Sequence, residues 1–452
     1  MKHAYSSISP RSNVFLVLLA ILIPVFLHAQ TPIKPVICGN EVLHDIWQKN
    51  YPVLIDNTNQ TFENARHAPR DLRNDPLEVN VVFHIVWNDA TENLADSIIQ
   101  NQLDILNRDF NKLNADTNQL RSLFKPITGN ANIHFNLASI VRVHTDELFS
   151  VDILGTNLLP EVKHTADGGS DAWDPTHYIN IWVCKIQPIV IFGLEVGQLF
   201  GFSFPPNNLP NWPTENGAPT PGEDGLVIDF RAVGANNPNT ILNPGTSETL
   251  VVKGRTPVHE MGHYFGLRHI WGDGGLLGPN DCQQSDGIDD TPYADAQSNF
   301  DCDTSKNTCG QLEPFYNADV PDLVENYMDY ASEECMVMFT HGQVDLMRNV
   351  LLDPRSGLLE NVSATHDILT TSAIKITPNP ANDVLTVQLM DDGDKIQMIN
   401  LVDFNGKIIL QQRDFSSSSK ARLSINDLPS GMYIMEVISS KGRQTGKVII
   451  QH

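Results

Sequence analysis

The sequence has few basic residues and, beyond its N-terminus, no long apolar runs. Of 452 residues, 30 are Lys or Arg and 54 are Asp or Glu, so the formal net charge is −24. This charge argues against nucleic acid or an anionic membrane surface as a partner. No stretch after the N-terminal region approaches the length of a transmembrane segment. The hydrophobic content of 41% supports packed cores, and the length predicts about two or three domains.

The N-terminus has the pattern of an export signal. Lys2 and Arg11 precede an apolar run from Val14 to Leu27, and a small residue stands just before Gln30. This pattern predicts a signal peptide over residues 1–29. A membrane anchor is the alternative, but the run is too short to span a bilayer. Export makes disulfides permissible, and four of the six cysteines form one cluster: Cys282, Cys302, Cys309 and Cys335.

A short pattern of histidines and one glutamate carries the clearest chemistry. In HEMGHYFGLRH, which starts at His259, the first two histidines are four residues apart and share one face of a helix. His259 and His263 can therefore bind one zinc ion, with Glu260 beside it as a base. Gly266 can adopt positive φ and end the helix, so that His269 returns as a third ligand. Three histidines leave the fourth zinc position open for water.

Residues 30–75 are polar and are expected to form an irregular, removable prosegment. Cys38 is an isolated cysteine near its start. In an exported zinc enzyme, this thiolate could occupy the open metal position and displace the catalytic water, which would keep a zymogen silent. An unpaired buried cysteine is the alternative. Arg66, Arg70 and Arg73 offer an accessible place at which the segment is removed.

After residue 76 the apolar pattern predicts a sheet and a helix that covers it. Strands are predicted at 77–87, 133–137 and 178–186. An apolar stripe predicts the helix and consists of Ile99, Leu103, Leu106, Phe110 and Leu113. The histidines in or beside the strands are interpreted as structural residues, and Cys184 as a small buried apolar one. These histidines are His84, His134 and His177.

The stretches on either side of the zinc motif predict a substrate edge and a second metal site. Residues 193–243 are rich in Pro, Gly and Asn and predict loops and one edge strand, to which an extended peptide can add. Thr256 and Pro257 predict the cap and first turn of the zinc helix. The carboxylates after the motif predict a calcium site, with a solvated acidic loop as the alternative. The candidate ligands are Asp286, Asp289, Asp290 and Thr291.

The segment Asn326-Tyr327-Met328-Asp329-Tyr330, together with the zinc motif, resembles the methionine turn of metzincin proteases. The closer resemblance is to the pappalysin family and covers about residues 76–352 and the prosegment cysteine. It implies an α+β catalytic domain with a twisted mixed sheet, an active-site helix and a loop-rich lower subdomain. The other matching segments are Gly254-Arg255-Thr256, Trp271-Gly272-Asp273, Asp289-Asp290-Thr291-Pro292 and Phe339-Thr340.

The resemblance also implies roles for individual residues. Zinc is bound by His259, His263 and His269, and Glu260 is the general base and acid in hydrolysis by a zinc-activated water. Met328 forms the floor of the site, and Tyr330 helps to stabilise the oxyanion. The implied disulfides are Cys282 to Cys309 and Cys302 to Cys335.

In the family, the segment after the methionine turn lines the S1′ pocket. Glu333 in this segment predicts a preference for Arg or Lys at P1′, the position after the scissile bond. A pair of surface glutamates is the alternative. With this preference, the enzyme could cut its own prosegment before Arg66, Arg70 or Arg73.

A polar linker at residues 353–372 precedes an all-β pattern at 373–452. Short strands and a hairpin turn at Asn405-Gly406 predict an Ig-like β-sandwich. Pro378-Asn379-Pro380 and residues 403–407 and 428–433 resemble the C-terminal sorting domain of type IX secretion cargo. This resemblance implies that the type IX machinery exports the protein through the periplasm of a Gram-negative cell, with removal of the domain. A carbohydrate-binding or adhesive sandwich is the alternative.

These observations predict a secreted, zinc-dependent endopeptidase that acts on proteins or peptides and is made as a latent proenzyme. The alternative is a surface adhesive or binding protein whose metalloprotease-like domain only holds zinc. The intact base Glu260 and the three histidines favour the protease.

Overall fold

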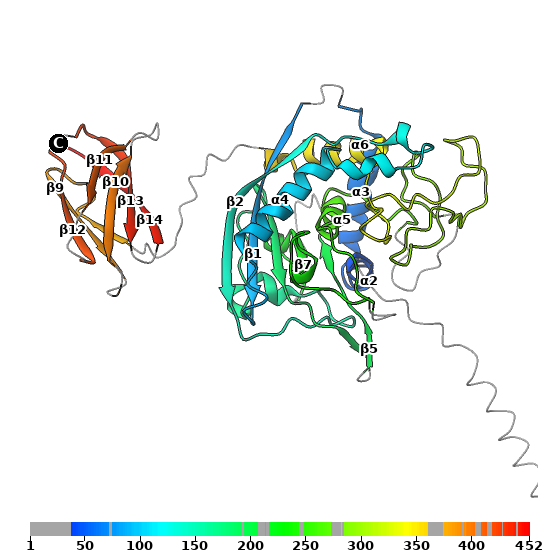
Figure 1. The fold of residues 1–452 in the computed structure, drawn as a ribbon, viewed down its shortest axis with the longest axis horizontal. Coiled ribbons are helices and arrows are strands. Elements are labelled where there is room, and N and C mark those ends of the chain that lie inside the picture. Colours follow the sequence, from blue (N-terminus) through cyan, green and yellow to red (C-terminus); the bar gives the residue numbers. More distant parts are fainter. Residues whose placement is uncertain are drawn as a thin grey trace, which may run out of the picture. The chain divides into compact units, whose positions relative to one another are not determined.

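The computed structural model describes most of the chain from Cys38 onward. The described residues are 38–71, 75–191, 194–206, 213, 217–243, 248–272, 282, 284–359, 374–390, 393, 395–402, 408–413, 418–426, 428–439 and 442–452. The predicted signal peptide and the turn at Asn405-Gly406 lie outside these residues. The chain divides into two compact units, 1–361 and 362–452 (Figure 1). No helix in the described part is long and apolar enough to cross a membrane.

A five-stranded sheet forms the centre of the first unit. Its order is β2-β1-β3-β7-β6, with β6 antiparallel to β7 and the other neighbours parallel. β6 lies at an edge of this sheet, within the stretch for which the sequence predicted an edge strand. The bounds are β1 Leu77–Trp87, β2 Ile133–His144, β3 Tyr178–Cys184, β6 Gly201–Ser203 and β7 Leu226–Asp229. A separate hairpin pairs β4 Ile189–Ile191 with β5 Leu194–Gly197.

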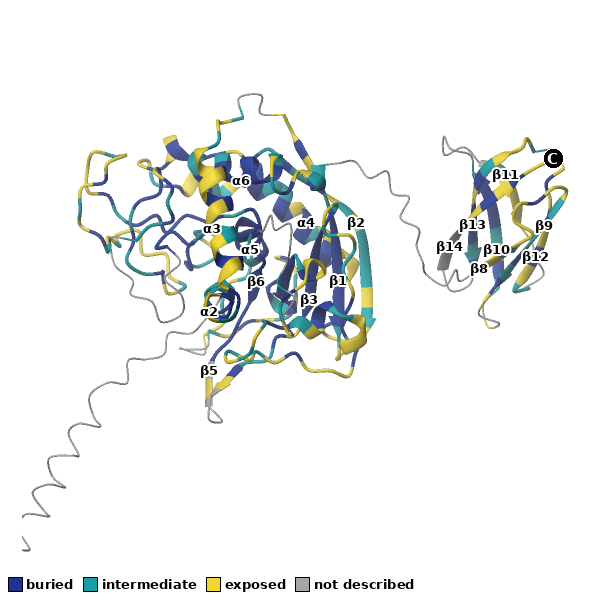
Figure 2. Cartoon of the chain, turned by 180° about the vertical axis from the view of Figure 1, so that it is seen from behind, coloured by how far each residue is buried: buried dark blue, intermediate teal, exposed yellow. Residues whose placement is uncertain are grey.

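Three helices of the first unit cover the sheet and close its core. They are α4 Asp96–Phe110, α5 Thr256–Tyr264 and α6 His341–Leu352. The predicted stripe of α4 is buried as far as Phe110, but Leu113 is 73% exposed because the helix ends before it. Figure 2 shows the dark, buried faces of these elements turned toward one another. Single turns of 3-10 helix lie at 115–119, 125–127, 160–163, 165–167, 221–223, 230–232 and 356–359.

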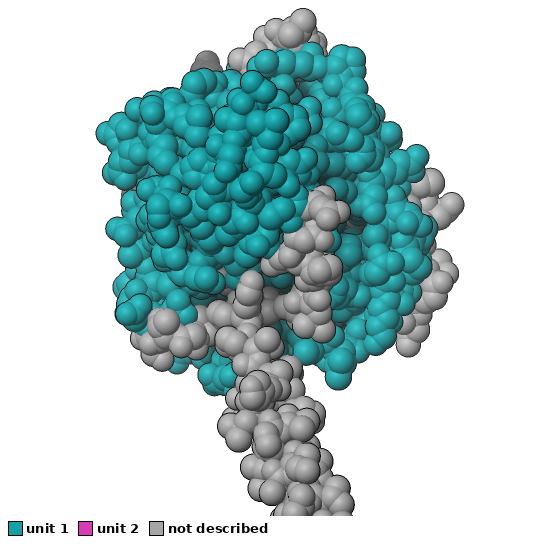
Figure 3. All heavy atoms as spheres, turned by 90° about the vertical axis from the view of Figure 1, so that its right-hand side faces the viewer, with its two compact units in different colours: residues 1–361 teal, residues 362–452 magenta. Residues whose placement is uncertain are grey.

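The N-terminal segment differs from the expectation of an irregular prosegment. It forms two helices, α2 Asn40–Asn50 and α3 Pro52–His67. Apolar residues of α2 recur at helical spacing and share a buried core with residues of the sheet. This burial stabilises the helix although most of its residues are polar. Trp47 packs edge-on against Phe204 at 5.1 Å between ring centroids. On the side shown in Figure 3, the described atoms of this unit form one continuous body.

The region after the zinc motif has little regular structure, and two disulfides connect it. Cys282 is bonded to Cys309, and Cys302 to Cys335, which confirms both predicted pairs. Cys38 and Cys184 are buried free cysteines. Disulfides lower the conformational entropy of the unfolded chain and so stabilise the folded state. This stabilisation matters in a loop region, which has few backbone hydrogen bonds.

Residues 353–359, which the sequence assigned to the linker, pack against the first unit. Arg355 makes a two-pronged ion pair with Asp224 and donates from Nε to the carbonyl oxygen of Tyr264 at 3.0 Å. Its guanidinium also lies 3.6 Å from the centre of the Tyr264 ring. Because this arginine holds the C-terminal end of α5, the segment just after α6 belongs structurally to the unit that contains the zinc motif.

The second unit is a β-sandwich, as predicted. One sheet has the order β11-β10-β13-β14 and the other the order β12-β9-β8. Alternate residues of these strands, such as Leu385, Val387 and Leu389 of β9, are buried between the sheets. The bounds are β8 Ile374–Thr377, β9 Val384–Leu389, β10 Ile396–Val402, β11 Ile408–Arg413, β12 Lys420–Ser424, β13 Gly431–Ser439 and β14 Gly442–Ile450.

Candidate active site

The N-terminus of α5 is capped by a residue far along the chain. The prediction that Thr256 is the cap is wrong, because the helix begins at Thr256 and Arg255 is the N-cap residue, without a capping side chain. Instead, Glu333 Oε1 accepts hydrogen bonds from Thr256 N and Oγ1, each at 2.8 Å. Glu333 Oε2 accepts from the backbone N–H groups of Arg255, at 3.0 Å, and Lys253. This carboxylate therefore occupies the position that helix amide groups and the helix dipole favour for an anion.

Arg255 fixes the loop that carries this carboxylate. Its guanidinium is 1% exposed, pairs with Asp109 and Asp116, and donates to the backbone oxygen of Glu333 at 2.6 Å. Gly254, at φ +73°, lets the chain pass close to α4, since a Cβ there would lie 2.6 Å from a methyl group of Ile105. The Gly254-Arg255-Thr256 motif thus connects α4, α5 and the loop after the methionine turn.

Gly266 ends the active-site helix, as predicted. Its φ of +94° turns the chain after Phe265, and Leu267 N donates to the carbonyl oxygen of Gly262 at 2.9 Å. The carbonyl oxygen of Leu267 lies 2.8 Å from Nδ1 of His263, so the same turn orients this imidazole. A residue with a Cβ would be strained at this φ.

The structure brings the three histidines of the motif together. His263 Nε2 lies 3.1 Å from His259 Nε2 and 3.0 Å from His269 Nε2, and all three side chains are buried. Tetrahedral zinc with bonds of about 2.0–2.1 Å separates two ligand nitrogens by roughly 3.3–3.4 Å, so the three nitrogens fit one zinc ion within a few tenths of an ångström. Cys38 Sγ belongs to the same group of atoms, which all lie within 4.8 Å of one another.

Glu260 lies beside this group, next to the edge strand. Burial raises the pKa of its carboxyl to about 8, which suits a group that exchanges a proton near neutral pH. Cys38 Sγ lies 3.7 Å from Glu260 Oε2. Gly201 of β6 is also close, because a Cβ built there would be 2.9 Å from Cγ of Glu260. Gly201 was not predicted as a site residue, although a glycine within an apolar strand is a signal of close approach.

The methionine turn lies beneath the histidines. Met328 is fully buried, and its sulfur would be 2.5 Å from a Cβ built on Gly262 of the active-site helix. The turn is held by Asn326, whose Oδ1 accepts from Met328 N at 2.9 Å. Tyr330 Oη lies 3.1 Å from His269 Nε2, which brings a hydroxyl to the metal-binding atoms. Trp271 stacks on the His269 ring at 4.6 Å.

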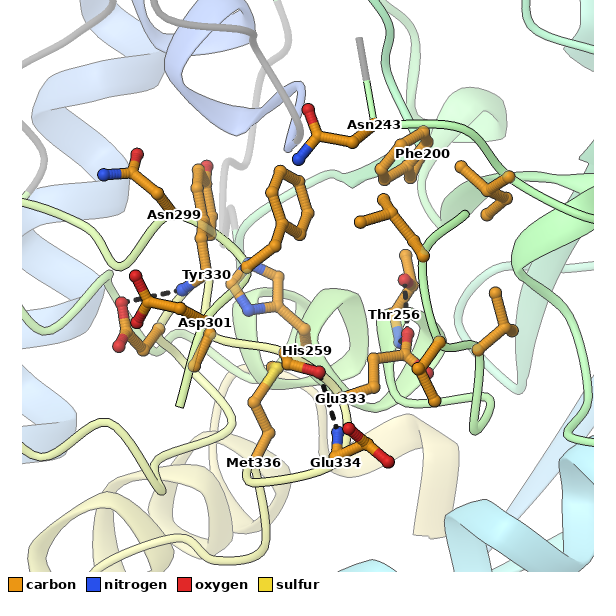
Figure 4. Close-up of a pocket in the computed structure, with 18 of the residues that line it drawn as sticks. Phe200, Asn243, Thr256, His259, Asn299, Asp301, Tyr330, Glu333, Glu334 and Met336 are labelled. Carbon is orange, nitrogen blue, oxygen red and sulfur yellow. Dashed lines mark hydrogen bonds between the residues drawn. The ribbon is translucent and has the colours of Figure 1, made fainter. Parts of the chain in front are cut away.

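A cavity of about 350 Å³ extends from His259 and Glu260. Figure 4 shows Glu333 and Thr256 on one side of it and Asp301 and Asn299 on the other. The apolar part of its wall includes Phe200, Ile241, Leu250, Val252, Phe300 and Met336. Among its described lining residues there is no Lys or Arg, whereas six are acidic: Glu248, Glu260, Asp301, Asp329, Glu333 and Glu334.

The candidate calcium ligands have different surroundings. Asp286 is buried, and its Oδ1 accepts from Thr291 Oγ1 at 2.6 Å and Ile288 N at 2.9 Å, whereas its Oδ2 has no hydrogen-bond partner among the residues that the structure describes. Burial raises the pKa of Asp286 to about 8. Asp290 accepts from Thr340 Oγ1 and Gly342 N and so supports the start of α6. Asp289 is exposed. Within the described residues, these four do not form a group like that of the histidines.

The interpretation of the other three histidines as structural residues agrees with their contacts. His84 is buried and lies within hydrogen-bond distance of Ser170 Oγ and Asn180 Oδ1. His134 contacts Asn132, and His177 contacts Asp174 at the surface. All three lie outside the group that can hold a metal.

Comparisons with known proteins agree with this geometry. A sequence model described as Pregnancy-associated plasma protein-A matches residues 241–352. An extracellular metalloprotease of Arthroderma benhamiae is 26% identical over 282 residues, 62% of this chain and 74% of that protein. The structure of a Tannerella forsythia promirolysin mutant is 28% identical, with a TM-score of 0.56, over 72% of this chain and 97% of that one. Mature mirolysin with a cleaved peptide is 31% identical, with a TM-score of 0.50, over 63% and 96%.

The fold and the three-histidine site define a metzincin-type metalloendopeptidase, a class whose implied metal is zinc. The chain belongs to the pappalysin family of these enzymes. A model described as Secretion system C-terminal sorting domain matches residues 375–451, so the second unit is a sorting domain and not a carbohydrate-binding module. The prediction of a protease is therefore confirmed over that of an adhesive protein.

Proposed function

We propose that His259, His263 and His269 hold the catalytic zinc and that Glu260 is the general base and acid of peptide hydrolysis. The observation that supports this assignment is the convergence of three buried imidazole nitrogens beside a buried carboxylate. A zinc ion in this position supplies an activated water and polarises the scissile carbonyl.

The chain's own residues supply the remaining steps. An extended substrate adds to β6, which aligns its backbone beside Glu260. The Glu260 carboxylate accepts a proton from the attacking water and delivers it to the leaving amine. We assign the Tyr330 hydroxyl, which lies 3.1 Å from His269 Nε2, the role of donor to the developing oxyanion.

The test compares wild type with Glu260→Ala on a protein substrate, with and without a chelator. We expect cleavage only by the wild type without chelator, and zinc bound by both proteins. Equal cleavage in all samples would reject the assignment.

Cys38 is proposed to keep the proenzyme latent by occupying the fourth ligand position. Its sulfur lies within the metal-binding group and accepts from Asn40 N at 3.4 Å, at the start of α2. The same segment covers the substrate edge, because Gly39 N donates to Gly201 O at 2.7 Å and Ser203 N donates to Asn40 Oδ1 at 2.9 Å. A Cys38→Ser proenzyme should therefore convert to the mature form faster than wild type; an unchanged rate contradicts this role.

The prosegment boundary is proposed to be cut by the enzyme itself. Arg66 lies in the last turn of α3 behind the buried Ala65, so a cut before it requires the helix to unwind. Arg70 is exposed and pairs with Asp345, while Arg73 lies outside the described residues. We therefore favour Arg70 or Arg73 over Arg66. Purified Glu260→Ala proenzyme that still matured without another protease would contradict self-cleavage.

A preference for Arg or Lys at P1′ is proposed from the charge of the cavity. The four hydrogen bonds to Glu333 leave it little capacity for a direct pair. The preference is therefore supported by the exposed carboxylates of the wall, Glu248, Asp301 and Glu334. Mass mapping of cleavage in a peptide library should show basic residues enriched at P1′. The ratio of kcat/KM for a substrate with Arg at P1′ to that for a substrate with Leu there measures the preference. Glu334→Gln should reduce this ratio about as much as Glu333→Gln does. A library without basic enrichment would sink the proposal.

Calcium binding near Asp286 is proposed from its unpaired, buried Oδ2. Added CaCl2 should raise the unfolding temperature of the Glu260→Ala protein, and Asp286→Asn should remove that rise while MgCl2 gives little effect. An equal shift in both proteins would locate the ion elsewhere.

The sorting domain and the extracellular relatives support secretion. We further propose a signal peptide at 1–29, passage through the periplasm of a Gram-negative cell by the type IX machinery, and removal of residues 373–452. Deleting the sorting domain should leave the protein in the periplasm, and mass analysis of the secreted form tests the removal.

A further inference from the structure

Each metal-binding histidine needs its other ring nitrogen oriented. Nδ1 of His259 lies 2.7 Å from Tyr327 O, and Nδ1 of His263 lies 2.8 Å from Leu267 O. Both carbonyl groups belong to the catalytic part of the chain and remain after any prosegment is removed. Such partners fix the tautomer and direct Nε2 toward the metal.

The third histidine faces a group from the N-terminal segment. His269 Nδ1 lies 3.8 Å from Oε1 of Glu41, and their side chains are 0% and 13% exposed. Glu41 is in the first turn of α2, three residues after Cys38 in the sequence, where the helix dipole stabilises a carboxylate. The segment therefore brings two side chains to the metal-binding group, the thiol of Cys38 and the carboxylate of Glu41.

We propose that Glu41 is a positioning residue of the proenzyme's zinc site. Its negative charge beside Nδ1 stabilises the N–H and the partial positive charge of a metal-bound imidazole, and so directs Nε2 of His269 to the zinc. This inference rests on the proposed latency through Cys38 and extends it. Removal of the prosegment takes away both Cys38 and Glu41, so the proenzyme holds zinc more tightly than the mature enzyme does.

The first experiment measures zinc release to a chromogenic chelator from intact proenzyme that carries Glu260→Ala to prevent self-cleavage. Glu41→Gln should speed release by roughly 10-fold, the lower end of the effect of losing a hydrogen-bonded partner, because the 3.8 Å between Glu41 Oε1 and His269 Nδ1 is longer than a hydrogen bond. Glu41→Asp should restore part of the retention. The control is Asp45→Asn, which changes an exposed carboxylate of the same helix and should release zinc as the parent does. Equal release by Glu41→Gln and Asp45→Asn overturns the inference.

A spectroscopic readout separates positioning from a general loosening of α2. With cobalt in place of zinc, Glu41→Gln should shift the visible absorption bands, while Asp45→Asn leaves them unchanged. Limited proteolysis should show the prosegment equally protected in both variants. Unshifted bands, or bands that shift only together with a loss of protection, contradict a positioning role.

The second experiment uses proenzymes with Glu260 intact and follows prosegment removal. Because residue 41 is removed with the prosegment, the mature enzymes from wild type and Glu41→Gln are identical, and a different rate reports only on the latent form. With zinc in excess, so that every site stays loaded, Glu41→Gln and Cys38→Ser should both mature faster, because each change weakens the hold of the prosegment on the zinc site. If only Cys38→Ser does so, the Glu41 inference fails and latency through Cys38 stands. If neither does, the latency proposal fails as well.

Discussion

Gly201 of the edge strand lies directly against the side chain of Glu260. A Cβ built on Gly201 would be 2.9 Å from Cγ and 3.2 Å from Oε1 of Glu260. Both distances are shorter than ordinary van der Waals contacts, so no larger residue fits without a shift of the Glu260 side chain. The edge strand is thus fitted to the base on one side and offers hydrogen-bonding groups on the other.

The Gly201→Ala variant should be a poor enzyme with a normal metal site. Because the added methyl group displaces Glu260, we expect kcat/KM of the mature form to fall by roughly 10- to 100-fold. Zinc content should not change, since the three histidines are untouched. The control is Gly222→Ala, whose new Cβ would meet no described atom closer than 3.7 Å. Wild-type kcat/KM in Gly201→Ala would show that Glu260 is not constrained by this strand.

Gly262 and Met328 should be energetically coupled. An alanine at Gly262 would place its Cβ 2.5 Å from the Met328 sulfur, so overpacking should reduce the free energy of unfolding by about 1–3 kcal/mol. Met328→Ala removes the clash but leaves a cavity. In a double-mutant cycle followed by chemical denaturation of Glu260→Ala protein, the two changes should cost less together than the sum of each alone. Strict additivity would contradict the contact.

Glu333 should contribute to stability through the helix cap. Glu333→Ala leaves buried amide groups at the start of α5 without an acceptor, which should lower the free energy of unfolding by about 1–2 kcal/mol. The control is Glu334→Ala, an exposed neighbour that should change it by less than about 0.5 kcal/mol. Denaturant unfolding of Glu260→Ala protein measures both. Equal stability of the two variants would mean that the cap is not needed.

His84 should make stability depend on mildly acidic pH. Burial lowers its pKa to about 4, whereas an unfolded histidine titrates near about 6.5. Between these values the unfolded chain binds more protons than the folded one, so stability is present above about pH 6.5 and falls as the pH decreases toward 4.

The free energy of unfolding of the parent protein, relative to that of its His84→Gln variant, should therefore decrease by roughly 2 kcal/mol between pH 7 and pH 5. Free energies of unfolding of Glu260→Ala protein, with and without His84→Gln, measure it. His144→Gln, at an exposed site in β2, controls for histidine loss in general. A pH-independent difference would show that folding does not lower the pKa of His84.

Local patterns in the sequence were sufficient to predict the main strands, the helix with the apolar stripe and the metal-binding motif. The spacing of His259 and His263 and the glycine at 266 act over single helical turns, where chain geometry leaves few choices. The strands of both units were also predictable, because an alternating or continuous run of apolar residues is a pattern of neighbouring positions in the sequence. The N-terminal helices were missed, since their polar average conceals a narrow apolar face.

Contacts between distant residues could be decided only by the tertiary structure. The cap of α5 comes from Glu333, 77 residues after Thr256, and no local rule specifies which carboxylate reaches a free helix end. In the same way, only folding brings Gly201 against Glu260 and Glu41 to within 3.8 Å of His269. The sequence by itself determined which residues can bind a metal and move a proton. The packing of separate segments decided how those residues are oriented, because orientation depends on neighbours that sequence distance does not reveal.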